Sequence, residues 1–246
     1  TAGLVVFLLI NYLQGEDFFT KKYEAFGLDY GHVPARYDAD TLQFQADTAI
    51  INEDKRTELQ HLNNWRSKFA VDHQPKMIFV CVSGGGKRAA LWTLNALQTA
   101  DSLSNGASTE HAVLITGASG GLIGASYYRE LKLRQKLGEP TRPNHASHRQ
   151  MISSDNLNPL IFSLLANDLF VGFTRFEYGN NLYKKDRAYT FEDQLNKITE
   201  QLMDHPISYY RDFEMKGLIP MVILTPTVVN DGRKIYIASR PVSFMN

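Results

Sequence analysis

Cysteine is nearly absent from this 246-residue chain, which contains only Cys81. A single cysteine cannot form an internal disulfide, which is consistent with a reducing compartment. Cys81 lies in an apolar run, so we expect it to be a small, buried hydrophobic side chain. Net charge is absent as well, because 26 basic side chains balance 26 acidic ones. Without a basic excess, nothing in the composition indicates a nucleic-acid partner.

Long apolar segments are also scarce. Residues 1–13 are almost wholly apolar but too short to span a bilayer, which takes about 20 residues. They form either a buried element or the end of a membrane helix, and we favour the second because acidic and aromatic residues follow at once. Lys21 and Lys22 come soon afterwards, and basic residues flank membrane helices on the cytoplasmic side. We therefore expect a membrane-associated protein whose main domain lies on the cytoplasmic side.

The composition changes again at about residue 75. Residues 14–75 are rich in tyrosine, histidine and charged residues, and residues 54–69 place Leu59, Leu62 and Trp65 on one helical face. We expect this region to be a membrane-proximal extension that packs on the main domain through Trp65. Residues 76–246 have the strand and helix signals of that main domain.

Two units of strand, glycine turn and helix open the main domain. Residues 77–82 are an apolar run typical of a strand buried on both faces, and Gly84-Gly85-Gly86 and a helix to about Ser102 follow. Residues 112–115 form the next strand, followed by Gly117-Ala118-Ser119-Gly120-Gly121 and a helix to about Leu137. This repetition predicts an α/β fold, a three-layer α/β/α domain with a mainly parallel sheet.

The remaining segments give weaker local signals. We expect a loop over 138–150, an apolar helix over 156–170, and a helix from a capping box at Thr190 to about Asp204. Residues 219–227 and 234–239 are typical of two strands joined by the turn Asn230-Asp231-Gly232. No carboxylate or cysteine is spaced beside the histidines of the 138–150 loop, so we expect no metal site there.

The glycine turns carry the chemistry. In G-x-S-x-G a strained strand-to-helix turn lifts the serine hydroxyl out of the fold, which makes Ser119 a candidate nucleophile. Three glycines at the end of the neighbouring strand allow close approach of a substrate to backbone N–H groups. Carboxyl ends of parallel strands open on the same edge of the sheet, so both turns are expected to form one site.

Dinucleotide binding is an alternative interpretation of the same glycines. Residues 84–89 match G-x-G-x-x-A after a strand, and Tyr128 and Lys132 match the Tyr-x-x-x-Lys pair of NAD(P)-dependent oxidoreductases. However, that pair lies on the helix that directly follows the serine turn, where it could not reach round to a cofactor. A P-loop is excluded, because Arg88 follows Lys87 where that motif requires serine or threonine.

The paired motifs Ser-Gly-Gly-Gly-Lys-Arg-Ala and Gly-Ala-Ser-Gly-Gly resemble those of the patatin-like phospholipases, relatives of the cytosolic phospholipases A. Residues 186–192 and 225–237 are similar to downstream elements of the family, so the resemblance extends from about Lys76 to the end. It implies a patatin-like fold and lipid acyl ester hydrolysis by a Ser–Asp dyad through an acyl-serine. It also implies a phospholipid or other acyl-lipid substrate at a membrane surface, with no cofactor and no metal.

Carried over residue by residue, the resemblance makes Ser119 the nucleophile. Gly85, Gly86 and the N–H of Gly120 would form the oxyanion hole, and Arg88 would contact the substrate.

One element of the family pattern is missing. The family's aspartate lies in Asp-Gly-Gly or Asp-Gly-Ala after the strand–turn–strand, and neither tripeptide follows Ser119. Asp231 is better explained by its turn, so we expect the aspartate beyond Asn246 and the 246-residue chain to be inactive or very slow. An α/β-hydrolase would instead use one of three histidines as base, His145, His148 or His205. A non-catalytic lipid-binding scaffold of the same fold is the remaining alternative.

Overall fold

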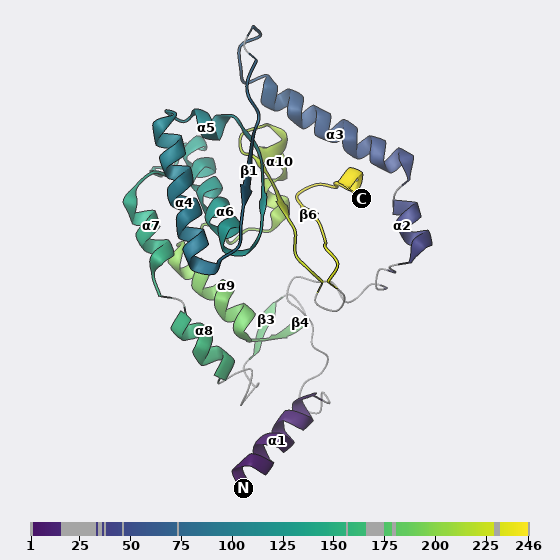
Figure 1. Ribbon diagram of the computed structural model, residues 1–246, viewed down its shortest axis with the longest axis vertical. Coiled ribbons are helices and arrows are strands. Elements are labelled where there is room, and N and C mark those ends of the chain that lie inside the picture. The colour runs from purple at the N-terminus through teal and green to yellow at the C-terminus, as the bar shows by residue number, and fades with distance from the viewer. Residues whose placement is uncertain are drawn as a thin grey trace. The chain divides into compact units, whose positions relative to one another are not determined.

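The chain divides into two compact units, one made of residues 1–36 with 155–198 and the other of 37–154 with 199–246. A computed structural model (Figure 1) describes residues 2–15, 33, 36, 38–45, 47–72, 74–155, 157–165, 175–178, 181–228 and 232–245. Within these ranges no helix combines the length and the apolar character that a membrane crossing requires.

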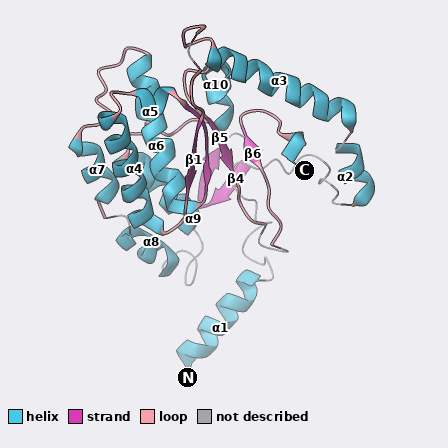
Figure 2. Cartoon of the chain, turned by 45° about the horizontal axis from the view of Figure 1, so that its top comes forward, coloured by secondary structure: helices cyan, strands magenta, loops and turns pink. Residues whose placement is uncertain are grey.

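The second unit contains the sheet. Strands β1 (Ile78–Val82), β2 (Ala112–Gly117) and β5 (Met221–Leu224) are parallel neighbours in that order. Strand β6 (Ile237–Ala238) pairs antiparallel with β5 at the other edge (Figure 2). The fold is therefore α/β with a mainly parallel, open sheet, as the two strand–turn–helix units predict.

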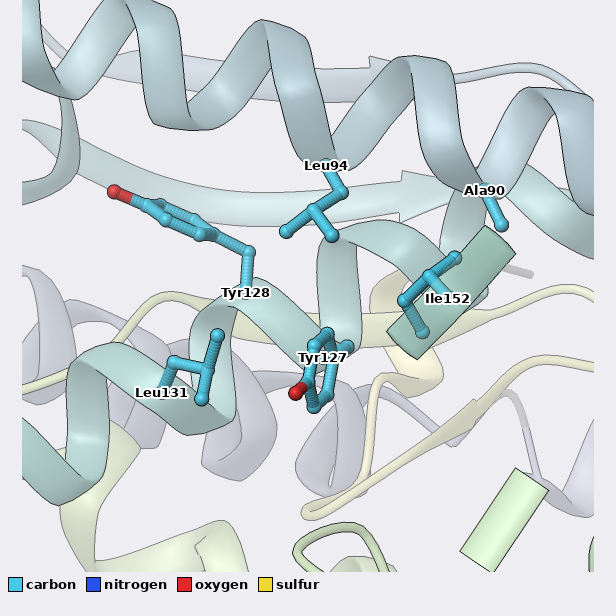
Figure 3. Packing of buried hydrophobic residues seen from close by; sticks show 6 residues of the cluster. All are labelled: Ala90, Leu94, Tyr127, Tyr128, Leu131 and Ile152. Carbon is cyan, nitrogen blue, oxygen red and sulfur yellow. The ribbon is translucent and has the colours of Figure 1, made fainter. Parts of the chain in front are cut away.

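Helices α4 (Gly86–Leu103) and α6 (Ser119–Lys136) cover one face of this sheet and pack closely against each other. A Cβ on Gly120 would overlap the carbonyl oxygen of Gly86, and one on Gly124 would overlap that of Ala90. Glycine is thus required where the two backbones meet. With α7 (Ala146–Ser153) they enclose a hydrophobic core (Figure 3) of Ala90, Leu94, Tyr127, Tyr128, Leu131 and Ile152.

Strand β1 differs from the sequence prediction. Val80 and Val82 pack on the α4–α6 side, but Phe79 is 58% exposed and Cys81 is exposed too. The predictions of a strand buried on both faces and of a buried Cys81 are therefore wrong. Among the described strands β1 pairs only with β2, and the two helices cover only the face opposite Phe79.

The helix predicted over 54–69 is observed as α3 (Thr48–Arg66), which begins earlier because the Asp47 side chain caps the N–H of Ala49. Trp65 is 1% exposed, and its Nε1 donates to the carbonyl of Glu110 at 3.2 Å. A Cβ on Gly217 would come within 2.8 Å of the Trp65 Cα. The prediction that Trp65 anchors this helix is confirmed.

Shorter elements complete the second unit. They are helix α2 (Ala39–Gln45), helix α5 (Ala107–Glu110), the 3₁₀ turn η2 (Ile207–Tyr210), helix α10 (Arg211–Met215) and the 3₁₀ turn η3 (Ser243–Met245). Helix α7 occupies part of the loop predicted over 138–150, because His145 caps it by accepting from the N–H of Ser147. The turn predicted around Asp231 lies partly outside the described residues, which resume at Gly232.

The first unit contains α1 (Ala2–Gly15), α8 (Leu157–Ser163), β3 (Arg175–Tyr178), β4 (Asn181–Lys184) and α9 (Arg187–Ile198). Helix α9 begins before the predicted capping box at Thr190, because the Asp186 carboxylate caps it at the N–H of Tyr189. The hairpin of β3 and β4 was not predicted. Its Phe176 ring packs against those of Tyr183 and Tyr189.

Candidate active site

Ser119 lies where β2 turns into α6, and its backbone is left-handed with a φ of 50°. A side chain other than glycine in this conformation costs about 1–3 kcal/mol, and such residues cluster at functional sites. The residue is exposed, and Ala118 before it is extended. This is the strained strand-to-helix elbow predicted from G-x-S-x-G.

The glycines around Ser119 are required by close contacts with the end of β1. Gly117 has a φ of 150°, and a Cβ there would overlap the carbonyl oxygen of Val82. A Cβ on Gly121 would likewise overlap that of Ser83. A Cβ on Gly84 would lie 3.3 Å from the Ser119 Cβ and 4.0 Å from its Oγ. The turn after β1 therefore lies directly beside the serine.

The predicted oxyanion-hole residues are in the same place. Gly85 and Gly86 have φ values of 138° and 58° and form the start of α4, and the Gly86 carbonyl lies against Gly120. The first N–H groups of a helix have no partner within it, so the starts of α4 and α6 both offer backbone donors. Ser119, Gly85, Gly86 and Gly120 are thus brought together, as the sequence analysis predicts.

A cavity of about 280 Å³ begins at Ser119. One face of α6 forms one wall, with Leu122, Ile123, Ser126 and Arg129 following the serine at helical spacing. The other walls come from the segment 203–210 and from β5, through Met203, His205, Ile207, Tyr210, Val222 and Leu224. Most of these side chains are apolar, so the cavity can accommodate a hydrocarbon group.

The α6 wall could have been found from the sequence, because it repeats the spacing that begins at Ser119. The wall from 203–210 could not, because only the folded chain brings that segment to the serine. Arg88 does not line this cavity. It is exposed on α4 and lines a separate cavity with residues of α7.

No carboxylate lines the Ser119 cavity among the described residues, and none of them forms a hydrogen bond with the Ser119 hydroxyl. Of the three histidines considered, only His205 lines the cavity. Arg134 Nη2 lies 3.1 Å from His205 Nε2. Because arginine can only donate, Nε2 is the acceptor and Nδ1 of the neutral ring carries the proton. His205 therefore has no free lone pair for the serine proton in this arrangement.

The other two histidines have structural contacts. His145 caps α7, and His148 lies 2.9 Å from Tyr127 Oη and 3.1 Å from the carbonyl of Arg142. Burial lowers the pKa of His148. His145 and His148 therefore form structural hydrogen bonds, and neither lines the Ser119 cavity.

The Tyr128 and Lys132 pair of the dinucleotide interpretation is buried on another face of α6. Tyr128 Oη donates to Asn144 at 3.0 Å, and burial, with Asp101 nearby, raises the pKa of its phenol. Lys132 Nζ forms an ion pair with Asp101 at 3.1 Å. A pair held in this way stabilises the helix packing and is not available to a bound cofactor.

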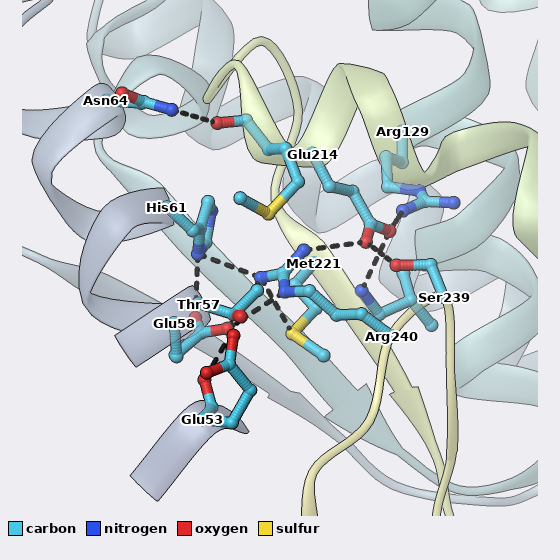
Figure 4. Close-up of polar contacts among 12 residues, drawn as sticks. Glu53, Thr57, Glu58, His61, Asn64, Arg129, Glu214, Met221, Ser239 and Arg240 are labelled. Carbon is cyan, nitrogen blue, oxygen red and sulfur yellow. Dashed lines mark hydrogen bonds and ion pairs between the residues drawn. The ribbon is translucent and has the colours of Figure 1, made fainter. Parts of the chain in front are cut away.

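Arg129 of the cavity wall also belongs to a set of interacting polar side chains that we call the Glu214 cluster (Figure 4): Glu58, His61, Arg129, Glu214, Ser239 and Arg240. Glu214 is fully buried and pairs with Arg129 Nη1 at 2.5 Å and with Arg240 Nη1 at 3.4 Å. The Ser239 hydroxyl donates to it as well.

The outer part of the cluster connects α3 to Arg240. Arg240 Nη2 lies 2.8 Å from the Glu58 carboxylate, and His61 Nδ1 lies 2.7 Å from its other oxygen. Burial alone would raise the pKa of Glu58, but the hydrogen bonds from His61 and Arg240 hold it below its ordinary value. The cluster ties α3, α6, α10, β5 and the segment after β6 together.

Comparison with protein-family models, curated proteins and solved structures gives no significant match to this chain. Within the described residues, no group of three or more His, Cys, Asp or Glu side chains could hold a metal ion.

Proposed function

We propose that this chain is a serine hydrolase of lipid acyl esters with a patatin-like, three-layer α/β/α fold, acting through an acyl-serine intermediate. The observation that carries the proposal is the exposed Ser119 in a left-handed backbone, in the lining of a mainly apolar cavity and beside a glycine turn. Strain at an exposed nucleophilic side chain is characteristic of catalytic elbows, whereas a structural serine has no need of it.

In the proposed reaction the Ser119 hydroxyl attacks the ester carbonyl, and backbone N–H groups at Gly85, Gly86 and Gly120 stabilise the oxyanion. The leaving alcohol takes the serine proton, and water then releases the fatty acid. The acyl chain lies along the apolar side chains of α6 and β5, of which Leu122, Ile123 and Leu224 line the cavity.

Efficient turnover also needs a base within hydrogen-bond reach of the serine. The family resemblance assigns this role to an aspartate, and the arrangement of His205 disfavours a Ser–His pair. We therefore propose the Ser–Asp mechanism in preference to an α/β-hydrolase triad. Its lipid substrate would be reached at a membrane surface on the cytoplasmic side, to which the apolar helix α1 and the basic residues after it are suited.

The proposal is tested by hydrolysis of p-nitrophenyl esters in a chain that includes the family's aspartate, as the wild type and as Ser119→Ala. We expect the hydrolysis rate of the variant to fall by several orders of magnitude, because loss of a serine nucleophile costs on the order of 10⁶ in turnover in serine hydrolases. Circular dichroism and thermal unfolding should show that the variant keeps its fold. Equal rates in two folded proteins would contradict the assignment and would favour the non-catalytic scaffold.

A second variant tests whether Asp231 is the catalytic base. Asp231→Asn removes the aspartate of the predicted Asp-Gly turn and should leave the rate of ester hydrolysis unchanged. Loss of the Ser119-dependent activity in Asp231→Asn would instead identify Asp231 as the base.

A further inference from the structure

A second cavity lies on the outer side of α4, away from the α6 contact. Its volume is about 540 Å³, and α4 contributes Arg88, Trp92 and Asn95 to its lining. Helix α7 supplies Arg149, Gln150 and Ser153. The family resemblance predicts Arg88 at the Ser119 site, but Arg88 lines this cavity instead.

Among the described residues, two arginines and no acidic side chain line the cavity. Arg88 is exposed, and no described residue pairs with it. Arg149 Nη1 donates to Gln98 Oε1 at 2.7 Å, and the buried Gln98 amide is itself fixed by the carbonyl of Pro143 at 2.7 Å. Arg149 is therefore held in position by a neutral partner, and no acidic side chain among the described residues forms an ion pair with either arginine.

These groups suit one type of ligand. Guanidinium groups bind phosphate oxygens through two parallel hydrogen bonds, and Asn95, Gln150 and Ser153 offer further donors. Trp92 lines the same cavity as the two arginines and is 72% exposed. Exposed tryptophan is enriched at the level of lipid head groups, where its ring contacts the apolar boundary and its N–H reaches water.

We infer that the cavity formed by Arg88, Trp92 and Arg149 binds the phosphate of a lipid head group at a membrane surface. Binding at this cavity would hold the unit on the bilayer. The contact would begin at Arg88, about one helical turn after the Gly85–Gly86 loop, and would lie outside the Ser119 cavity. The inference rests on the proposed function for the choice of a lipid as the source of the phosphate.

The test measures binding in the Ser119→Ala background, so that its result does not depend on hydrolysis. Sedimentation is carried out with vesicles of phosphatidylcholine alone and of phosphatidylcholine mixed with phosphatidic acid. We expect the mixed vesicles to bind more tightly. Arg88→Gln should weaken this binding about fivefold, and Arg88→Gln with Arg149→Gln about 30-fold, since each basic side chain at an anionic surface contributes about 1 kcal/mol.

Arg211→Gln is the matched control, because Arg211 is an exposed arginine on α10 outside the cavity. It should leave vesicle binding unchanged, and a loss equal to that of Arg88→Gln would show that bulk charge alone is responsible and overturn the site. Equal binding to both kinds of vesicle would overturn it too. Trp92 fluorescence during titration with glycerol 3-phosphate separates the sources: saturation by this soluble phosphate without vesicle binding would refute a lipid ligand.

Discussion

Two of the polar side chains that helix α6 presents to the cavity, Ser119 and Arg129, have opposite surroundings. Arg129 is buried, paired with Glu214, hydrogen-bonded to the carbonyl of Pro220 at 3.1 Å and stacked over the Tyr210 ring at 4.2 Å. Ser119, ten residues earlier in the numbering, is exposed on a strained backbone with no hydrogen bond to its hydroxyl from any described residue. The comparison separates polar groups that stabilise the fold from one that is left available for chemistry.

Of the substitutions considered, removal of the Glu214 carboxylate should lower the free energy of unfolding most. Glu214→Ala leaves Arg129 and Arg240 buried without their shared carboxylate, and breaking a buried pair in this way costs about 3–5 kcal/mol. Urea unfolding measures the change. Glu139→Ala is the control, because that carboxylate is exposed and should contribute less than about 0.5 kcal/mol. Similar losses in both variants would show that the cluster is not a stabilising centre.

Changes at the glycine loop should affect catalysis more than folding. Gly85→Ala places a methyl group on a backbone with a φ of 138° and should displace a donor of the proposed oxyanion hole. Loss of one such donor reduces kcat about 10²–10³-fold, equivalent to about 2.7–4 kcal/mol, while KM changes little. Steady-state kinetics separates the two constants. A change confined to KM would assign the loop to substrate binding.

The close approach of α4 and α6 gives an intermediate effect. Gly124→Ala forces the new methyl group against the Ala90 carbonyl and pushes the helices apart, which should cost about 1–3 kcal/mol. The same separation moves Gly86 away from Gly120, so activity should fall with stability. A variant as stable and active as the wild type would show that the helices are not held together at this point.

The smallest expected effect is a gain in stability, and it comes from Ser119→Gly. Ser119→Gly removes the side chain that is strained at positive φ, so unfolding should become more costly by about 1 kcal/mol even though the nucleophile is lost. Thermal unfolding of Ser119→Gly beside Ser119→Ala isolates the backbone strain. A glycine variant no more stable than the alanine variant would mean that the elbow is relaxed.

Local sequence signals were sufficient for the part of the site that one strand–turn–helix unit builds. The elbow at Ser119, the glycine start of α4 and the α6 wall follow from glycine positions and helical spacing. The exposure of Cys81 could not be predicted in this way, because an apolar run can form either an edge strand or a central strand of a sheet. The wall formed by residues 203–210 and the position of Arg88 depend on tertiary packing. Neither could be predicted from residue types or from their spacing along the chain.

The most direct test of the central claim is reaction of a fluorophosphonate with a chain that includes the family's aspartate, followed by peptide mapping of the adduct. Ser126 is an internal control, because it lines the same cavity but lies within α6 rather than at its strained start. The account predicts a covalent adduct on Ser119 and none on Ser126. An unmodified Ser119, or equal modification of both serines, would contradict it.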